Sequence, residues 1–203
     1  MSEDISAQDL MAAYGISFEE EAGGEYRGVM VVAEAVGDEV SQASLGALGF
    51  GREIADAFGA RLEALLMGAG EDAAQGLIRR GADVVLIAEA GEYQQAAWAG
   101  ALASAIESRK PEVVLLGGSD ISKDLAPRVA QRLDTGLIAG ARQVRAEADE
   151  RLVVGLVPLY GGKLLGDFAC PQKRPQMISL AEGAGRMPSE DRSRQGEVER
   201  LAL

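Results

Sequence analysis

Four continuous apolar segments of strand length limit this chain to few folds. They are GVMVVAEA (28–35), RLEALLMG (61–68), ADVVLIAEA (82–90) and EVVLLGG (112–118). These segments are rich in Val, Ile and Leu and do not alternate between apolar and polar residues, which is typical of strands covered on both faces. The sequence therefore predicts strands that lie inside a parallel sheet.

The intervals between these segments have the apolar spacing of helices. The expected helices cover residues 41–59, 70–81, 92–110 and 122–134. Strand and helix alternate, so the sequence predicts an α/β fold with three α/β/α layers around a mostly parallel, Rossmann-like sheet. Within the first helix, Gly46, Gly49 and Gly51 do not interrupt the apolar spacing, and we expect them to allow close helix packing rather than to bind phosphate.

The pattern of apolar and turn-forming residues changes after Gly136. Residues 141–181 read as short strands with turns at 148–150 and 161–162, which predicts antiparallel additions to the sheet near the C-terminus. Residues 1–25 are strongly acidic and predict a flexible extension, and residues 182–203 are polar and predict a linker-like tail. The sequence thus predicts one α/β domain over residues 26–181.

Composition excludes several classes of function. The chain has 203 residues and a net charge of −12, which argues against binding to nucleic acid or to an anionic membrane. Neither a signal peptide nor a membrane-spanning apolar segment is evident, so we expect a cytoplasmic protein without membrane insertion. The chain has one cysteine, Cys170, and no histidine, which excludes an internal disulfide, cysteine-based and histidine-based metal sites, and histidine-based catalysis. We therefore expect no enzyme and no metal site.

The turn after the fourth apolar segment is the candidate binding site. Gly117, Gly118 and Ser119 precede a helix, so their N–H groups and Lys123 could hold a phosphate. The spacing fits neither the Walker pattern nor the dinucleotide-binding GxGxxG pattern. The alternative is a tight structural turn in which Ser122 or Asp124 caps the helix.

Two glutamates and a tryptophan also stand at informative positions. Glu34 and Glu89 end apolar segments, where α/β proteins place their sites, but without a paired acid or histidine we expect solvated or helix-facing carboxylates. Trp98 lies in an alanine-rich helix, where we expect it to anchor the core or a subunit interface.

The order of these motifs resembles the N-terminal domain of the electron transfer flavoprotein α subunit. The most specific part is KDLAPRVA (123–130) followed by DTGL (134–137), and YGG (160–162) and RPQM (174–177) extend the similarity. The segment MPSEDRSRQGEV (187–198) is similar to the connector that leads into that family's C-terminal domain.

The resemblance implies an adenine-nucleotide-hydrolase type of fold and an αβ heterodimer. In that family FAD accepts electrons from acyl-CoA and related dehydrogenases, as in fatty acid β-oxidation, and it lies mainly in the C-terminal α domain. The expected partners are a β-type subunit, a separate FAD domain and a dehydrogenase, and we expect this chain alone to bind no cofactor tightly. The family's version of the 117–124 turn is generally empty, which favours the structural interpretation.

The chain departs from the family pattern in three ways. We expect it to lack the C-terminal domain and with it the main FAD site, and two stretches of sequence also differ. Residues 178–181 read ISLA where the family has ATVR, and Gly140 replaces an acidic residue.

Two functions remain open at this point. The first is a scaffold module of an electron transfer flavoprotein, with residues 151–180 (Leu156, Leu159, Tyr160 and Phe168) and the Trp98 helix as the expected partner surface. The second is a stand-alone nucleotide-binding protein of the universal-stress-protein kind that uses the 117–124 turn.

Overall fold

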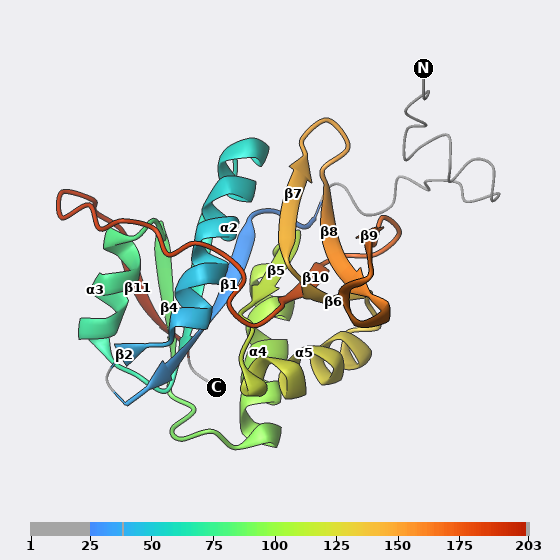
Figure 1. The fold of residues 1–203 in the computed structure, drawn as a ribbon. Coiled ribbons are helices and arrows are strands. Elements are labelled where there is room, and N and C mark those ends of the chain that lie inside the picture. Colours follow the sequence, from blue (N-terminus) through green and yellow to red (C-terminus); the bar gives the residue numbers. More distant parts are fainter. Residues whose placement is uncertain (1–24, 38, 202–203) are drawn as a thin grey trace.

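The computed structural model describes residues 25–37 and 39–201. The expected acidic extension, residues 1–25, lies almost wholly outside them. A central sheet of parallel strands forms the middle layer, as the apolar segments predicted (Figure 1). Across the sheet its strands are β11 (Glu197–Leu201), β4 (Val84–Ala88), β3 (Leu62–Met67), β1 (Val29–Val36), β5 (Val113–Leu116), β10 (Gln176–Leu180) and β6 (Leu137–Ala141). The short strand β2 (Glu39–Val40) pairs antiparallel with β1.

Helices cover both faces of this sheet and complete the three layers. One face is covered by α2 (Gln42–Phe58) and α3 (Glu71–Arg79), and the other by α4 (Gln95–Arg109) and α5 (Asp120–Arg132). Successive residues of β1 belong to different clusters, because Val29 and Val31 pack with α2 whereas Met30 and Val32 pack with α4 and α5. This explains why the strands are continuously apolar.

The antiparallel strands form a second, smaller sheet. It consists of β7 (Gln143–Glu147), β8 (Leu152–Leu159) and β9 (Leu164–Ala169), in that order. A short 3-10 helix, η2 (Tyr160–Gly162), connects β8 to β9. Val144 and Val153 of this sheet pack beside α2 on the same face of the central sheet.

The C-terminal residues differ from the expected linker. Glu197–Leu201 form β11, which pairs in parallel with β4 over its full length. Residues 181–196, which we call the strap, cross the α2 face to reach this position (Figure 1). The sequence EVERL places Val198 and Leu201 against the core and leaves its charged residues for ion pairs. Because the charged residues of β11 are paired rather than replaced by apolar ones, its composition is as polar as that of a linker, which is why the sequence predicted one.

Candidate functional site

The sheet has one topological switch point, between β1 and β5. From β1 the strand order proceeds through β3 to β4 on one side and from β5 through β10 to β6 on the other. In open α/β sheets, ligands bind at the carboxyl edge beside this point. The chain places Glu34 and the Gly117–Ser119 turn there, so this is the candidate site.

Glu34 is the central side chain of the site and is almost fully buried, with 2% of its surface exposed. Its Oε2 accepts a hydrogen bond from the Ser119 hydroxyl at 2.6 Å. Its Oε1 accepts from the Ser122 hydroxyl. The expectation that Glu34 is solvated was therefore wrong, and the expectation that it faces a helix was correct.

Ser119 also caps α5. Its Oγ accepts a hydrogen bond from the Ser122 N–H at 2.9 Å, so the N-cap is Ser119 rather than Ser122 or Asp124. Helix N-termini attract anions because their N–H groups are unpaired and their dipole end is positive. At the start of α5 the Ser119 and Ser122 hydroxyls donate to the carboxyl group of Glu34, so a group of the chain itself lies where a phosphate would be expected.

The two glycines of the turn accommodate the chain's own main chain. A Cβ atom on Gly118 would lie 2.2 Å from the carbonyl oxygen of Ala181, and one on Gly117 would lie 2.6 Å from the carbonyl carbon of Ala43. Real Cβ atoms never approach so closely, so these positions require glycine whether or not a ligand binds.

Lys123, the fourth predicted site residue, makes an ion pair outside this cluster. Its Nζ lies 3.0 Å from Oδ1 of Asp120, and this hydrogen bond raises the lysine pKa. The turn and Glu34 therefore come together as the site, whereas Lys123 stabilises the exposed first turn of α5.

A tyrosine–aspartate pair that the sequence did not reveal lies next to α5. Tyr93 donates a hydrogen bond to Asp124 at 2.5 Å, and Asp124 also accepts one from Arg128 at 3.1 Å. Burial, followed by this hydrogen bond, raises the pKa of Tyr93 to about 12. The same bond lowers the pKa of Asp124, so this aspartate joins the connection before α4 to α5 instead of capping a helix.

The strap closes the α2 side of the site. A Cβ atom on Gly46 would lie 2.7 Å from the carbonyl oxygen of Ala184, and one on Gly49 would lie 2.2 Å from that of Arg186. These glycines do allow close packing, as expected, but against an extended main chain. Gly51 instead faces the sheet, where a Cβ would meet Val31 at 2.5 Å.

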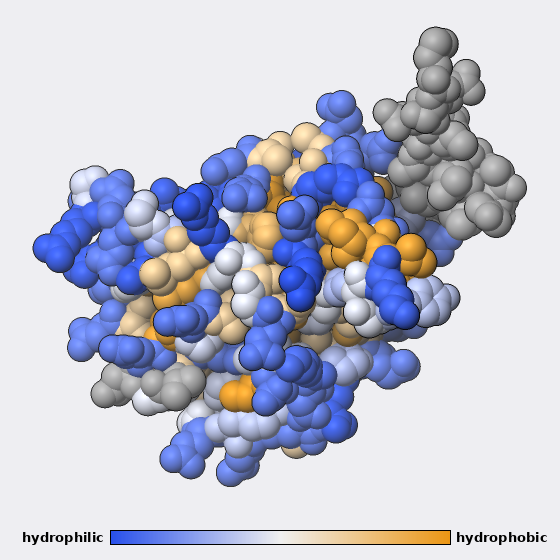
Figure 2. All heavy atoms as spheres, in the orientation of Figure 1, coloured by the Kyte–Doolittle hydropathy of each residue, from blue (hydrophilic) through white to orange (hydrophobic). Residues whose placement is uncertain are grey.

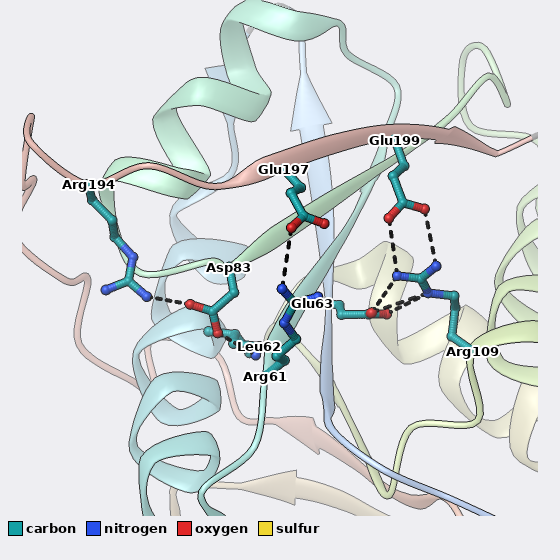
Figure 3. A network of polar contacts seen from close by, with 8 residues as sticks. All are labelled: Arg61, Leu62, Glu63, Asp83, Arg109, Arg194, Glu197 and Glu199. Carbon is teal, nitrogen blue, oxygen red and sulfur yellow. Dashed lines mark hydrogen bonds and ion pairs between the residues drawn. The ribbon is translucent and has the colours of Figure 1, made fainter.

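Ion pairs hold the strap and β11 in place (Figure 3). Arg109 on α4 lies 2.6 Å from Glu63 of β3 and 3.1 Å from Glu199 of β11. Further along the same edge, Arg61 lies 3.3 Å from Glu197.

Asp83 anchors the strap just before β4. It accepts hydrogen bonds from the Leu62 N–H at 2.8 Å and from Arg194 of the strap at 2.7 Å (Figure 3). Burial alone would raise the pKa of Asp83, but the bonds from Leu62 and Arg52 and the nearby arginine charges outweigh it, and the pKa is lowered.

A separate pocket of about 560 Å³ lies at the opposite, amino edge of the sheet. Two of its charged residues, Arg151 and Glu112, pair with each other. Arg151 donates to Glu112 at 2.7 Å and lies 4.9 Å from the centre of the Phe58 ring. Glu112 is 3% exposed, so this pair joins the small sheet to the start of β5.

Other site classes are not seen in residues 25–37 and 39–201. These residues contain no group of three or more cysteines and carboxylates able to hold a metal ion. None of their helices is both long and apolar enough to cross a membrane. Trp98 is 1% exposed and meets Tyr93 edge-on at 5.2 Å, so it anchors the core rather than an interface.

Comparisons with known proteins identify the family of this chain. The family model described as "Electron transfer flavoprotein domain" matches residues 29–203. Protein FixB of Clostridium saccharobutylicum is 37% identical over 162 residues, covering 78% of this chain and 48% of that protein. The electron transfer flavoprotein subunit alpha of Megasphaera elsdenii is 34% identical over 178 residues, covering 86% of this chain and 53% of that protein.

A third relative is named as a subunit of an enzyme complex. The acryloyl-CoA reductase electron transfer subunit beta of Anaerotignum propionicum is 30% identical over 159 residues, covering 66% of this chain and 43% of that protein. The chain spans about half the length of the curated relatives it matches. The family model covers nearly all of the α/β domain, the strap and β11, and the chain therefore belongs to the electron transfer flavoprotein family, among its α-type subunits.

Proposed function

We propose that this chain is the scaffold module of an αβ electron transfer flavoprotein that passes electrons from acyl-CoA-type dehydrogenases through FAD. In this role it binds a β-type subunit and supports a flavin domain, and it performs no chemistry of its own. The observation that carries the proposal is the closed switch point. Glu34 occupies the α5 N-terminus and the strap covers the α2 side, so the usual ligand position is filled by the chain itself.

The residues at the switch point do not fit the phosphate groups of FAD. The Ser119 and Ser122 hydroxyls, which would bind a phosphate, already donate to Glu34. A phosphate beside that carboxyl group would also be repelled by it. We therefore place the flavin elsewhere in the assembled complex, and no step of electron transfer is assigned to these residues.

The names of the relatives support a partner chain. Two of them are described as subunits, one as an alpha subunit and one as an electron transfer subunit of acryloyl-CoA reductase. We propose a β-type subunit as the direct partner, with a dehydrogenase as the electron donor of the complete assembly.

The alternative function, a stand-alone nucleotide-binding protein using Gly117, Gly118, Ser119 and Lys123, gains no support from the geometry. A nucleotide phosphate would have to displace Glu34, and Lys123 already pairs with Asp120.

Co-expression with a β-type subunit from the same source tests the proposal. We expect an affinity tag on this chain to retain the partner, and light scattering after size exclusion to give the mass of a one-to-one complex. The untagged pair serves as the control for retention by the resin. A chain that remains monomeric beside an excess of folded partner would refute the scaffold function.

A further inference from the structure

Strand β9 has a free edge. It pairs with β8 through residues from Leu164 to Ala169, and no other strand of the described chain pairs with it. The N–H and C=O groups along its outer side are therefore available to a strand from another chain.

The side chains of this edge are unusually apolar. Four of the five most exposed large hydrophobic residues in the described chain lie in this short stretch: Tyr160 at 78%, Leu164 at 57%, Leu165 at 59% and Phe168 at 43%. The space-filling view shows hydrophobic residues gathered over β8 and β9 (Figure 2). We call these four residues the β9 patch.

The pairing register places the patch on both faces of the strand. Leu164 lies opposite Leu159, and Leu165 lies opposite Pro158. Neighbouring residues in a strand point to opposite faces, so the two leucines flank the free edge from both sides. A partner strand would bury both at once.

Two of the other outer strands, β7 and β11, carry several charged residues, whereas β9 carries one. The outer strand β7 carries Arg145 and Glu147, and β11 carries Glu197, Glu199 and Arg200. The one charge of β9, Asp167, pairs with Arg145 across the sheet at 2.9 Å. Charges, proline or bulges protect most natural edge strands from pairing with other chains. An apolar edge without such protection indicates that another chain covers it.

The net charge around the small sheet indicates which kind of chain covers the β9 edge. Residues 141–175, which contain the small sheet and its loops, carry six Lys and Arg and four Asp and Glu, a net charge of +2. The whole chain carries −12. Two copies of this chain therefore repel each other, whereas a different chain with an acidic rim would be attracted to this region.

We propose that a strand of the β-type partner subunit, apolar at its centre and acidic around its rim, adds to the free edge of β9. The contact buries the β9 patch and extends the small sheet by one strand. This inference rests on the proposed function, because it names the surface through which that partner binds.

Charged substitutions in the patch test the inference in the co-expressed complex. Leu164→Glu and Leu165→Glu change exposed side chains, and Met187→Glu is the matched control, because Met187 is 55% exposed and lies in the strap. We expect each leucine variant to weaken binding of the β-type subunit by about tenfold or more, as truncation of a central interface residue does, and the control to bind normally. Circular dichroism confirms that each variant is folded.

Hydrogen exchange of the unsubstituted chain provides a measurement that does not depend on folding of the variants. Adding the β-type subunit should slow exchange of the amides in residues 164–169. Normal binding by both leucine variants, with no added protection of these residues, would overturn the inference and leave the proposed function standing. Failure of the unsubstituted chain to bind would overturn both. A dimer of this chain alone that Leu165→Glu dissociates would assign the edge to a second copy and overturn the inference.

Discussion

The Ser119 hydroxyl donates a hydrogen bond to Glu34 at 2.6 Å and thereby joins the start of α5 to the end of β1. The two residues belong to elements on either side of the switch point, where a ligand would lie in a nucleotide-binding relative of this fold. Through this bond a carboxyl group of the chain occupies the place at the start of α5 where an anion would bind. The switch point between β1 and β5 thereby becomes part of the folded core.

Removing the carboxyl group of Glu34 should therefore destabilise the fold. Glu34→Ala leaves the buried Ser122 hydroxyl and the half-buried Ser119 hydroxyl without their acceptor, and we expect the free energy of unfolding to fall by about 2 kcal/mol in urea titrations. Glu89→Ala is the matched control, since Glu89 directly follows β4 but its side chain is 68% exposed beside Arg200. We expect that change to be within about 0.5 kcal/mol. Equal losses in the two variants would contradict the buried role of Glu34.

The strap can be released by adding one methyl group. Gly49→Ala would normally stabilise a helix by about 0.5–1 kcal/mol, but here the Cβ would lie 2.2 Å from the Arg186 carbonyl oxygen. We expect lower stability and faster tryptic cleavage after Arg186. In Gly76→Ala the nearest atom to the new Cβ is Nη1 of Arg80 at 3.5 Å, an ordinary contact distance, so this α3 variant should gain the helix stabilisation. If both variants are stabilised, the strap does not pack on α2.

Most of the fold could be predicted from the sequence, because its strongest signals are local. Strands such as β1 and β4 are buried on both faces, which makes them continuously apolar and easy to recognise. The intervening helices carry their own apolar spacing, as α2 does.

The strap and β11 could not be predicted, because contacts distant in sequence determine them. Glu197 and Glu199 read as solvated residues until their partners, Arg61 and Arg109, are known. The glycines of α2 indicated that another segment packs closely on this helix. Their spacing alone cannot tell whether that segment is a helix or an extended chain. Glu34 is similar, since its serine partners lie 85 and 88 residues away.

Arg109 should matter more for β11 than the exposed Arg61. Arg109→Gln leaves Glu63, whose side chain is 17% exposed, without its cation, and we expect a loss of about 1–2 kcal/mol. Arg61→Gln breaks a pair in which both side chains are at least 60% exposed, so its effect should be within about 0.5 kcal/mol. Hydrogen exchange should show the amides of residues 198–201 protected in the unsubstituted chain and faster in Arg109→Gln. Fast exchange of β11 in the unsubstituted chain would contradict its place in the sheet.

Asp83 should make the fold sensitive to acid. Its pKa is lower in the folded chain than the value of about 3.9 expected when unfolded, so its stabilisation is present above that pH and is lost as pH falls through the folded pKa. We expect Asp83→Asn to be less stable than the unsubstituted chain at neutral pH, and the difference to shrink near pH 3. Urea titrations at both pH values measure it. A difference that is the same at both would show that the aspartate charge is not what stabilises the strap.

The claim that the switch point is closed by the chain itself is tested most directly by calorimetric titration with AMP, ATP and FAD. The account predicts no binding heat for any of them at micromolar concentrations, both in the unsubstituted chain and in Lys123→Ala. Lys173→Ala is the control, because Lys173 is 51% exposed and pairs with Asp134. Stoichiometric binding of AMP or ATP that is lost in Lys123→Ala and kept in Lys173→Ala would contradict it, and would identify the 117–124 turn as a nucleotide site.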